Sequence, residues 1–149
     1  LVDVKKEFNN SIFYSELTGE IKLQDEINVL IIDNIGMLSK LYQYALVTYV
    51  GGGFGNEGVH NVLEAAVYGK PVIFGPVYEK YSEARGLVES GGAISVNGPL
   101  QLESVLTLLF NDKDALKKSS AAAEEFVYKN KGATKKIIDH IQRNRLLIN

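Results

Sequence analysis

Residues 47–64 read Val-Thr-Tyr-Val-Gly-Gly-Gly-Phe-Gly-Asn-Glu-Gly-Val-His-Asn-Val-Leu-Glu. The opening residues are typical of a buried strand, glycine fills four of the five positions 51–55, and residues 58–68 are predicted to form a helix. Glycines allow backbone N–H groups to approach a ligand closely, and the first turn of a helix has N–H groups without partners. The stretch therefore predicts a site for an anion such as phosphate, phosphonate or carboxylate.

Strands and helices alternate on both sides of this stretch. The predicted strands are residues 11–14, 28–32, 46–50, 71–74 and 93–96, with a turn at 18–20, and the predicted helices are 36–45, 58–68, 79–90, 99–110, 113–129 and 133–146. The alternation favours an α/β fold, a Rossmann-like parallel sheet with helices on both faces and extra C-terminal helices outside it. The length of 149 residues suits a single domain over 1–149.

Composition excludes several classes of function. The net charge is −2, so we expect no nucleic-acid partner, and the absence of cysteine excludes disulfides and thiolate metal sites. Two histidines are too few for a histidine metal site, so no metal is expected. No apolar run reaches the roughly 18 residues that a membrane span needs. The chain begins at Leu1 without a methionine, and we expect it to be a fragment of a longer protein.

Polar and glycine-rich residues follow three of the predicted strands, at Asp33–Gly36, Gly51–Gly55 and Gly75–Tyr78. Open parallel sheets bind ligands outside the carboxyl ends of their strands. A small domain does not need so many consecutive glycines for a turn, which favours a role in ligand binding over plain turn geometry.

Four polar residues follow the glycines at helical spacing and are predicted to share one helix face: Glu57, His60, Asn61 and Glu64. His60 can donate a hydrogen bond to an anion, and Glu64 can accept hydrogen bonds from a ribose diol. Asn61 as a simple helix cap and Glu64 as a solvated surface residue remain open. The residues Tyr78, Lys80, Tyr81 and Arg85 either line the same cleft or form an ordinary loop. Lys117-Lys118, Lys135-Lys136 and His140 are predicted to lie on solvated helix surfaces.

Residues 53–58 also match the dinucleotide-binding pattern G-x-G-x-x-G. That fold needs an acidic residue about 20 positions later, at the end of the next strand, to hold the ribose. Here the next strand ends in Phe74-Gly75-Pro76, which contains no acid. NAD binding is therefore disfavoured.

Three segments together resemble the 3-deoxy-D-manno-octulosonic acid (Kdo) transferases. They are Gly51-Gly52-Gly53-Phe54, Gly58 to Ala66 with its G-x-H-N-x-L-E pattern, and Gly69-Lys70-Pro71 to Pro76. Residues 32–42 and Lys131-Gly132-Ala133-Thr134 are similar to further segments of that family, so the likeness runs from about Asp33 to the end.

The resemblance implies a two-domain GT-B glycosyltransferase that moves Kdo from CMP-Kdo to a lipid A precursor in lipopolysaccharide synthesis, and these residues look like its C-terminal, donor-binding half. It implies that Ile35 and Gly36 lie by the cytosine, that Gly52, Gly53 and Phe54 lie by the charged groups of the donor, and that Asn61 and Glu64 lie by phosphate and ribose. His60 completes the predicted donor-binding set. The family often has serine where Gly53 stands and glutamate where Met37 stands.

The same resemblance implies that no catalytic residue lies in this chain, because the catalytic carboxylate of the family belongs to the N-terminal half. The isolated fragment is therefore expected to be inactive and soluble. CMP-Kdo is expected as donor substrate with no cofactor, and the acceptor is expected to bind through the missing half, at the cytoplasmic face of the bacterial inner membrane. Three alternatives remain: another GT-B nucleotide-sugar enzyme, such as a UDP-sugar transferase or epimerase; a nucleotide-sugar binding module; and a pure interaction domain.

Overall fold

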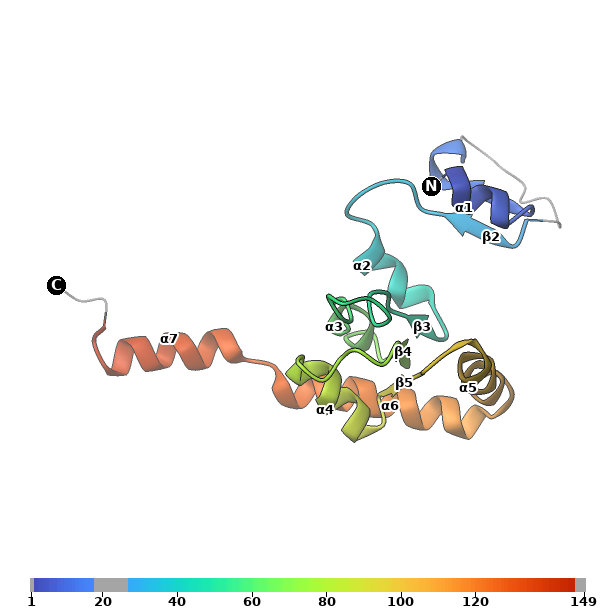
Figure 1. Ribbon diagram of the computed structural model, residues 1–149. Helices are drawn as coiled ribbons and strands as arrows, with labels where there is room; N and C mark the ends of the chain where they lie inside the picture. The colour runs from blue at the N-terminus through green and yellow to red at the C-terminus, as the bar shows by residue number, and fades with distance from the viewer. Residues whose placement is uncertain (1, 18–26, 147–149) are drawn as a thin grey trace. The chain divides into compact units, whose positions relative to one another are not determined.

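The computed structural model describes residues 2–17 and 27–146 and forms two compact units, residues 1–41 and 42–149 (Figure 1). The expected single domain over 1–149 stays a prediction, and the turn predicted at residues 18–20 lies outside the described residues.

The first unit is built on a pair of short parallel strands. It contains α1 (Val2–Glu7), β1 (Ser11–Phe13), the 3-10 helix η1 (Tyr14–Glu16), β2 (Val29–Ile31) and α2 (Leu38–Leu41). Ser11 pairs with Val29 and Phe13 with Ile31. Both strands were predicted from their apolar runs, whereas α1 was not predicted.

Asp33 joins the end of β2 to η1. Its carboxylate accepts a hydrogen bond from the backbone N–H of Ser15 at 3.0 Å and a second from the Ser15 hydroxyl. The hydroxyl bond is the main cause that lowers the pKa of Asp33. This strand-end carboxylate therefore has a structural role within the first unit.

The second unit holds a three-stranded parallel sheet in the order β3-β4-β5. Its elements are η2 (Tyr42–Tyr44), β3 (Thr48–Tyr49), α3 (Leu63–Ala66), β4 (Val72–Phe74), α4 (Ser82–Ser90), β5 (Ala93–Ser95), α5 (Pro99–Asn111), α6 (Lys113–Asn130) and α7 (Ala133–Arg143). Val72 of the central strand pairs with Thr48 on one side and with Ala93 on the other.

Helices cover both faces of this sheet. Val72 and Phe74 belong to a buried cluster with residues of α3, α4 and α6, while Ile73 between them belongs to a second cluster with Val96 and Leu109. Successive residues of a strand point to opposite faces, so β4 is buried on both sides. The predicted α/β fold, a Rossmann-like parallel sheet with helices on both faces, is confirmed.

The predicted helix over residues 58–68 is wrong in its first half, because α3 spans only Leu63–Ala66. Gly58 has a φ of +88°, and the N–H groups of Val59 and His60 bond to Val77 O and Gly51 O. The φ of Gly58 lies outside the helical region, and these two bonds, one to the loop after β4 and one within the same loop, hold Val59 and His60 in the loop. The helix predicted over residues 36–45 is also divided, into α2 and the 3-10 helix η2.

The later helices lie close to their predicted ranges, although α4 begins three residues later and α7 ends three residues earlier than predicted. Gly91, with a φ of +82°, ends α4; Pro99 opens α5; and Asp112 caps α6 by accepting hydrogen bonds from Asp114 N at 2.9 Å and Ala115 N at 3.0 Å. Figure 1 shows α7 continuing beyond the end of α6, away from the sheet. Within the described residues, no helix combines the length and the apolarity required to cross a membrane.

Candidate functional site: the paired loops after β3 and β4

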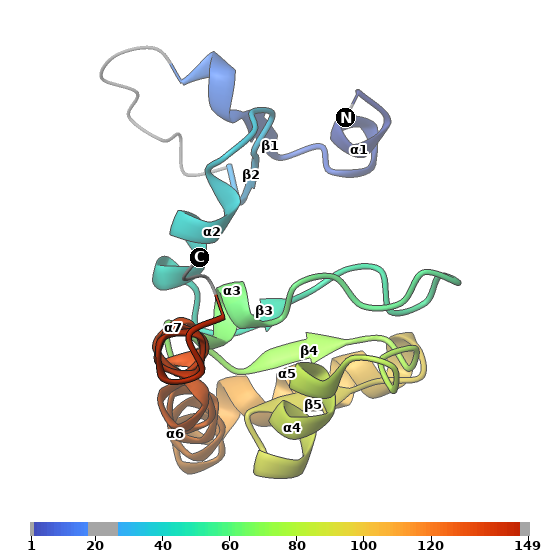
Figure 2. The same ribbon diagram turned by 90° about the vertical axis from the view of Figure 1, so that its left-hand side faces the viewer.

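The loops that follow β3 and β4 leave the sheet on the same side (Figure 2) and are joined by backbone hydrogen bonds. Val77 N–H donates to Gly53 O at 2.9 Å, and Val59 N–H donates to Val77 O at 3.0 Å. His60 N–H closes the first loop on itself by donating to Gly51 O at 3.0 Å. The sheet thus brings residues 51–60 and 75–81 together at the carboxyl ends of its strands, where α/β proteins bind ligands.

Close approach of backbones explains two of the glycines. A Cβ atom at Gly52, where φ is +88°, would lie 2.3 Å from Gly58 O, and one at Gly53 would lie 2.6 Å from Gly75 N. Neither contact is possible for any residue with a side chain. Close backbone contacts therefore account for glycine at these two positions, and a role in ligand binding stays a prediction.

The same turn offers hydrogen-bond donors. Within the described residues, the backbone N–H groups of Gly52, Gly53 and Phe54 form no backbone hydrogen bond. Successive backbone N–H groups in such a turn form a concavity suited to an anion. The helix end expected to assist them is absent, because α3 begins only at Leu63.

His60 lies beside the glycine turn. Its side chain is exposed, and a Cβ atom at Gly52 would lie 2.7 Å from His60 Cδ2. The predicted helix face of Glu57, His60, Asn61 and Glu64 is nevertheless wrong, since only Glu64 belongs to a helix. His60 is brought to the turn by the bond between its N–H and Gly51 O.

Asn61 and Glu64 form a hydrogen-bonded pair at the start of α3. Asn61 Nδ2 donates to Glu64 Oε1 at 3.0 Å, while Asn61 Oδ1 accepts from the Leu63 N–H at 3.1 Å. Burial raises the pKa of the Tyr42 hydroxyl, and the charge of Glu64 raises it further. Asn61 thus binds the first N–H group of α3 and also orients a half-buried carboxylate. The donor contacts of Asn61 and Glu64 stay predictions.

Tyr81 has a role that sequence reasoning missed. Its hydroxyl donates to Glu57 O, and a Cβ atom at Gly58 would lie 2.7 Å from its ring atom Cε2. Lys80 Nζ lies 5.2 Å from the centre of the same ring, and Tyr78 packs against Phe74 with ring centroids 5.2 Å apart. Tyr78 and Tyr81 therefore fix the loops. In the sequence, the contact of Tyr81 with the loop was indicated only by the glycine at position 58, which leaves room for the ring.

No protein-family model matches the chain. It is 33% identical over 144 residues to the 3-deoxy-D-manno-octulosonic acid transferase of Rickettsia prowazekii, covering 91% of this chain and 30% of that protein. It is 35% identical over 113 residues to the enzyme of the same name from Aquifex aeolicus, covering 75% of this chain and 30% of that protein.

This chain is related to the Kdo transferases. The resemblance found in its motifs is thereby confirmed, and the chain spans about 30% of the length of the curated relatives it matches. Its fold is similar to the crystal structure of the C-terminal CMP-Kdo binding domain of WaaA from Acinetobacter baumannii, with a TM-score of 0.73 at 20% identity over 85% of this chain and 65% of that one.

Two further residues of the predicted set, Ile35 and Gly36, lie in the first unit, whereas the paired loops lie in the second. Ile35 is fully exposed, and Gly36 has a φ of +95° with open space where a Cβ atom would stand. The cytosine contacts that the likeness to Kdo transferases implies for them stay predictions.

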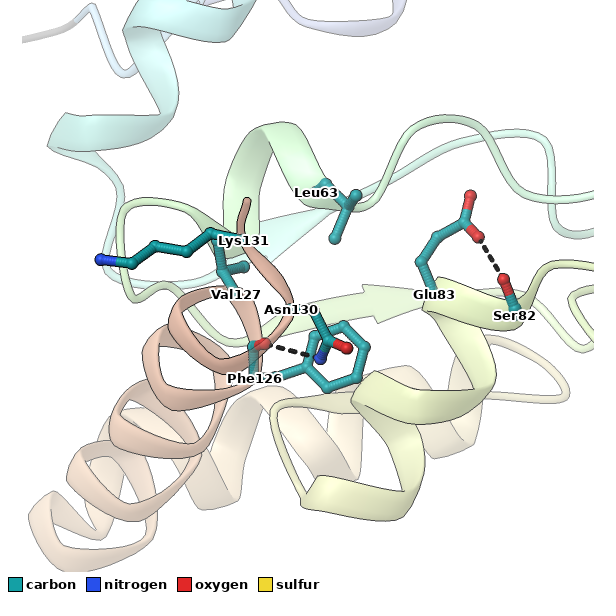
Figure 3. Close-up of a pocket in the computed structure, with 7 residues that line it drawn as sticks. All are labelled: Leu63, Ser82, Glu83, Phe126, Val127, Asn130 and Lys131. Carbon is teal, nitrogen blue, oxygen red and sulfur yellow. Dashed lines mark hydrogen bonds between the residues drawn. The ribbon is translucent and has the colours of Figure 1, made fainter. Parts of the chain in front are cut away.

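A cavity of about 460 Å³ outside the predicted set lies between α3, the start of α4 and the end of α6 (Figure 3). It is lined by Leu63, Ser82, Glu83, Phe126, Val127, Asn130 and Lys131. Three of its polar groups are already engaged, because Ser82 Oγ donates to Glu83 at 3.0 Å and Asn130 Nδ2 donates to Phe126 O at 2.8 Å. Two of the lining residues, Leu63 and Lys131, belong to segments that resemble the Kdo transferases.

Proposed function

We propose that this chain is the donor-binding part of a glycosyltransferase that transfers Kdo from CMP-Kdo to a lipid A precursor at the cytoplasmic face of a bacterial inner membrane. The relation to Kdo transferases supports the reaction class. The observation that carries the proposal is the loop pair, in which the amides of Gly52 to Phe54 form no backbone hydrogen bond and Gly52 lies beside His60, with the Asn61–Glu64 pair next along the chain.

Each of these groups has a matching part of the donor. In the proposal the phosphate of CMP accepts hydrogen bonds from the turn amides and His60, and the Glu64 carboxylate accepts from the ribose diol. As the bond between Kdo and the phosphate breaks, negative charge builds up on the departing CMP, and fixed N–H donors stabilise it. The base that takes the proton of the acceptor hydroxyl belongs to a longer protein. No cofactor is needed.

Nucleotide preference tests this proposal. Half of a cleft should bind CMP weakly, at about millimolar Kd or roughly 4 kcal/mol. At about ten times that concentration, the chain gains roughly 1.4 kcal/mol, which raises the melting temperature by about 3–6 °C. Thermal melting with CMP, UMP and AMP measures this rise.

A preference for CMP supports the proposal. An equal or larger rise with UMP would favour the alternative, a UDP-sugar transferase or epimerase. The absence of any rise would favour an interaction domain.

A further inference from the structure

The hydroxyl of Ser95, the last residue of β5, reaches the loop that follows the neighbouring strand β4. Ser95 stands opposite Phe74 in the β4–β5 pair, and its Oγ donates to Gly75 O at 3.3 Å. Within the part of the chain that the structure describes, this hydroxyl is the one hydrogen-bond partner of the Gly75 carbonyl. Gly75 is buried, so loss of the hydroxyl would leave a buried carbonyl without a partner. Ser95 therefore fixes the start of the loop after β4.

Proline at position 76 increases the importance of this bond. The nitrogen of Pro76 carries no hydrogen, so the Gly75–Pro76 peptide group has only its carbonyl oxygen with which to form a hydrogen bond. The proline ring also disfavours helical backbone angles at the residue before it, which keeps Gly75 extended at the end of β4. The position of this peptide group along the sheet edge thus depends on the Ser95 hydroxyl.

Gly75 is also in close contact with the glycine turn after β3. A Cβ atom at Gly75 would lie 2.5 Å from Gly53 C and 2.7 Å from Phe54 Cδ2, and Val77 N–H donates to Gly53 O at 2.9 Å. Segments packed this closely transmit a displacement from one to the next. A shift of Gly75 would therefore move Gly53 and Phe54, whose N–H groups form no backbone hydrogen bond within the described residues.

We propose that Ser95 is a positioning residue for the donor phosphate. Through Gly75 it holds the N–H groups of Gly53 and Phe54 in the places where the phosphate accepts hydrogen bonds from them. This rests on the proposed function, in which these amides bind the phosphate of CMP. N–H donors that are already in place stabilise a phosphate without any rearrangement of the protein. Every contact in this sequence of residues lies inside the second unit, so the proposal requires no exposed face of the chain.

Two substitutions of nearly the same shape isolate the hydroxyl. Ser95→Thr keeps it, whereas Ser95→Val replaces it with a methyl group, and both β-branched residues suit a strand. Titration of the whole chain with CMP, followed by nuclear magnetic resonance, measures the dissociation constant of each variant. We expect Ser95→Val to bind CMP about three- to tenfold more weakly than Ser95→Thr, which is the range that one neutral hydrogen bond supports.

Amide hydrogen exchange without nucleotide reports the position of the loops directly. In Ser95→Val the Val77 amide, which donates to Gly53 O, should exchange about three- to tenfold faster than in Ser95→Thr, each measured relative to the amides of α5 in the same variant. Because this measurement requires no ligand, it separates the role of Ser95 from the nucleotide preference of the site.

Ser119→Ala is the matched control. It also removes a serine hydroxyl that donates to a glycine carbonyl, Gly91 O at 2.9 Å, but this bond lies before the opposite end of β5. The control should lower the melting temperature of the chain and leave both the CMP dissociation constant and the relative exchange of Val77 unchanged. It thus distinguishes a general loss of stability from a displaced phosphate site.

Equal CMP affinity of Ser95→Thr and Ser95→Val would overturn the proposal, whatever their exchange rates, and so would an equal loss of affinity in Ser119→Ala. A loss of affinity in Ser95→Val without faster exchange at Val77 would overturn the route through Gly75. If Val77 exchanges faster in Ser95→Val but the unmodified chain does not bind CMP, the proposed function fails, and Ser95 then supports the loop without serving a phosphate.

Discussion

At the scale of single residues, the most informative group is the Glu64 carboxylate. One oxygen accepts from Asn61 Nδ2, and the other has no hydrogen-bond partner within the described residues. Glu64 also lies near enough to Tyr42 for its charge to raise the pKa of that phenol. A carboxylate oriented in this way, half-buried and with one oxygen unused, suits a ligand that brings hydroxyl donors.

Glu64→Gln should weaken donor binding with little effect on stability. Glutamine can still accept from Asn61, so the start of α3 is preserved, but the charge is lost. Hydrogen bonds to a charged partner contribute about 1.5–3 kcal/mol, which corresponds to roughly ten- to a hundredfold in donor efficiency of a full-length enzyme. Steady-state kinetics with CMP-Kdo, and loss of the CMP-induced rise in melting temperature of this chain, measure the effect.

Glu89→Gln is the matched control, because Glu89 is an exposed glutamate on α4. It should leave both readouts unchanged. Normal donor efficiency in a folded Glu64→Gln variant would instead assign Glu64 to the solvated surface.

Tyr81→Phe should loosen the loop at residues 51–60. The change removes only the hydroxyl that donates to Glu57 O, and a single neutral hydrogen bond contributes about 0.5–1.5 kcal/mol. We expect a slightly lower melting temperature and faster amide hydrogen exchange in this loop than elsewhere in the sheet. Tyr44→Phe, at a tyrosine that is 79% exposed, should change neither. If the amides of this loop exchange no faster in Tyr81→Phe than in Tyr44→Phe, backbone hydrogen bonds alone hold the loop.

At the scale of elements, stability depends on how closely α6 packs on the start of β5. Gly92 lies directly before that strand, and a Cβ atom there would stand 2.7 Å from the backbone of Ala123 in α6. Ser119 of the same helix donates from its hydroxyl to Gly91 O at 2.9 Å. The two elements are thus joined by a backbone-to-backbone contact that leaves no room for a side chain.

Gly92→Ala should therefore destabilise the second unit. Overpacking a close contact costs typically about 1–3 kcal/mol, because the backbone must shift to admit the added methyl group. Denaturant unfolding measures the loss. Gly98→Ala is the control, because that position has an extended backbone with open space around it, and it should unfold like the unmodified chain. An equal free energy of unfolding for the two variants would show that α6 can shift to admit the methyl group at little cost.

At the scale of the whole molecule, the chain spans about 30% of the length of the curated relatives it matches. Its described residues hold a set of groups suited to a nucleotide-sugar donor, while the resemblance to Kdo transferases assigns the catalytic carboxylate to the other half. A donor site without a base and an acceptor site cannot complete a transfer.

We therefore expect no transfer of Kdo to a lipid A precursor by this chain alone. The measurement is incorporation of radiolabelled Kdo from CMP-Kdo into the lipid, with a full-length relative as the positive control. CMP should still raise the melting temperature of the chain under the same conditions. Turnover by the purified chain would contradict the two-domain assignment.

The sequence by itself determined the fold class, most of the later elements and the relation to Kdo transferases. Periodicity and local signals such as Pro99 and Gly91 act between neighbours along the chain, so α4, α5, α6 and α7 were predicted close to their observed positions. The placement of Val72 and Phe74 on one face of β4 and of Ile73 on the other likewise depends only on the two-residue repeat of a strand.

The tertiary structure alone decided the arrangement of the site. Residues 58–62 have a helical sequence pattern, but Val59 bonds to Val77 in the loop after β4 and His60 bonds to Gly51 within its own loop. These contacts outweigh local propensity. The clash that makes Gly53 obligatory comes from Gly75, 22 positions later in the chain, and the bond that holds Glu57 comes from Tyr81. Such contacts depend on which loops the sheet brings together, and no spacing within one segment encodes them.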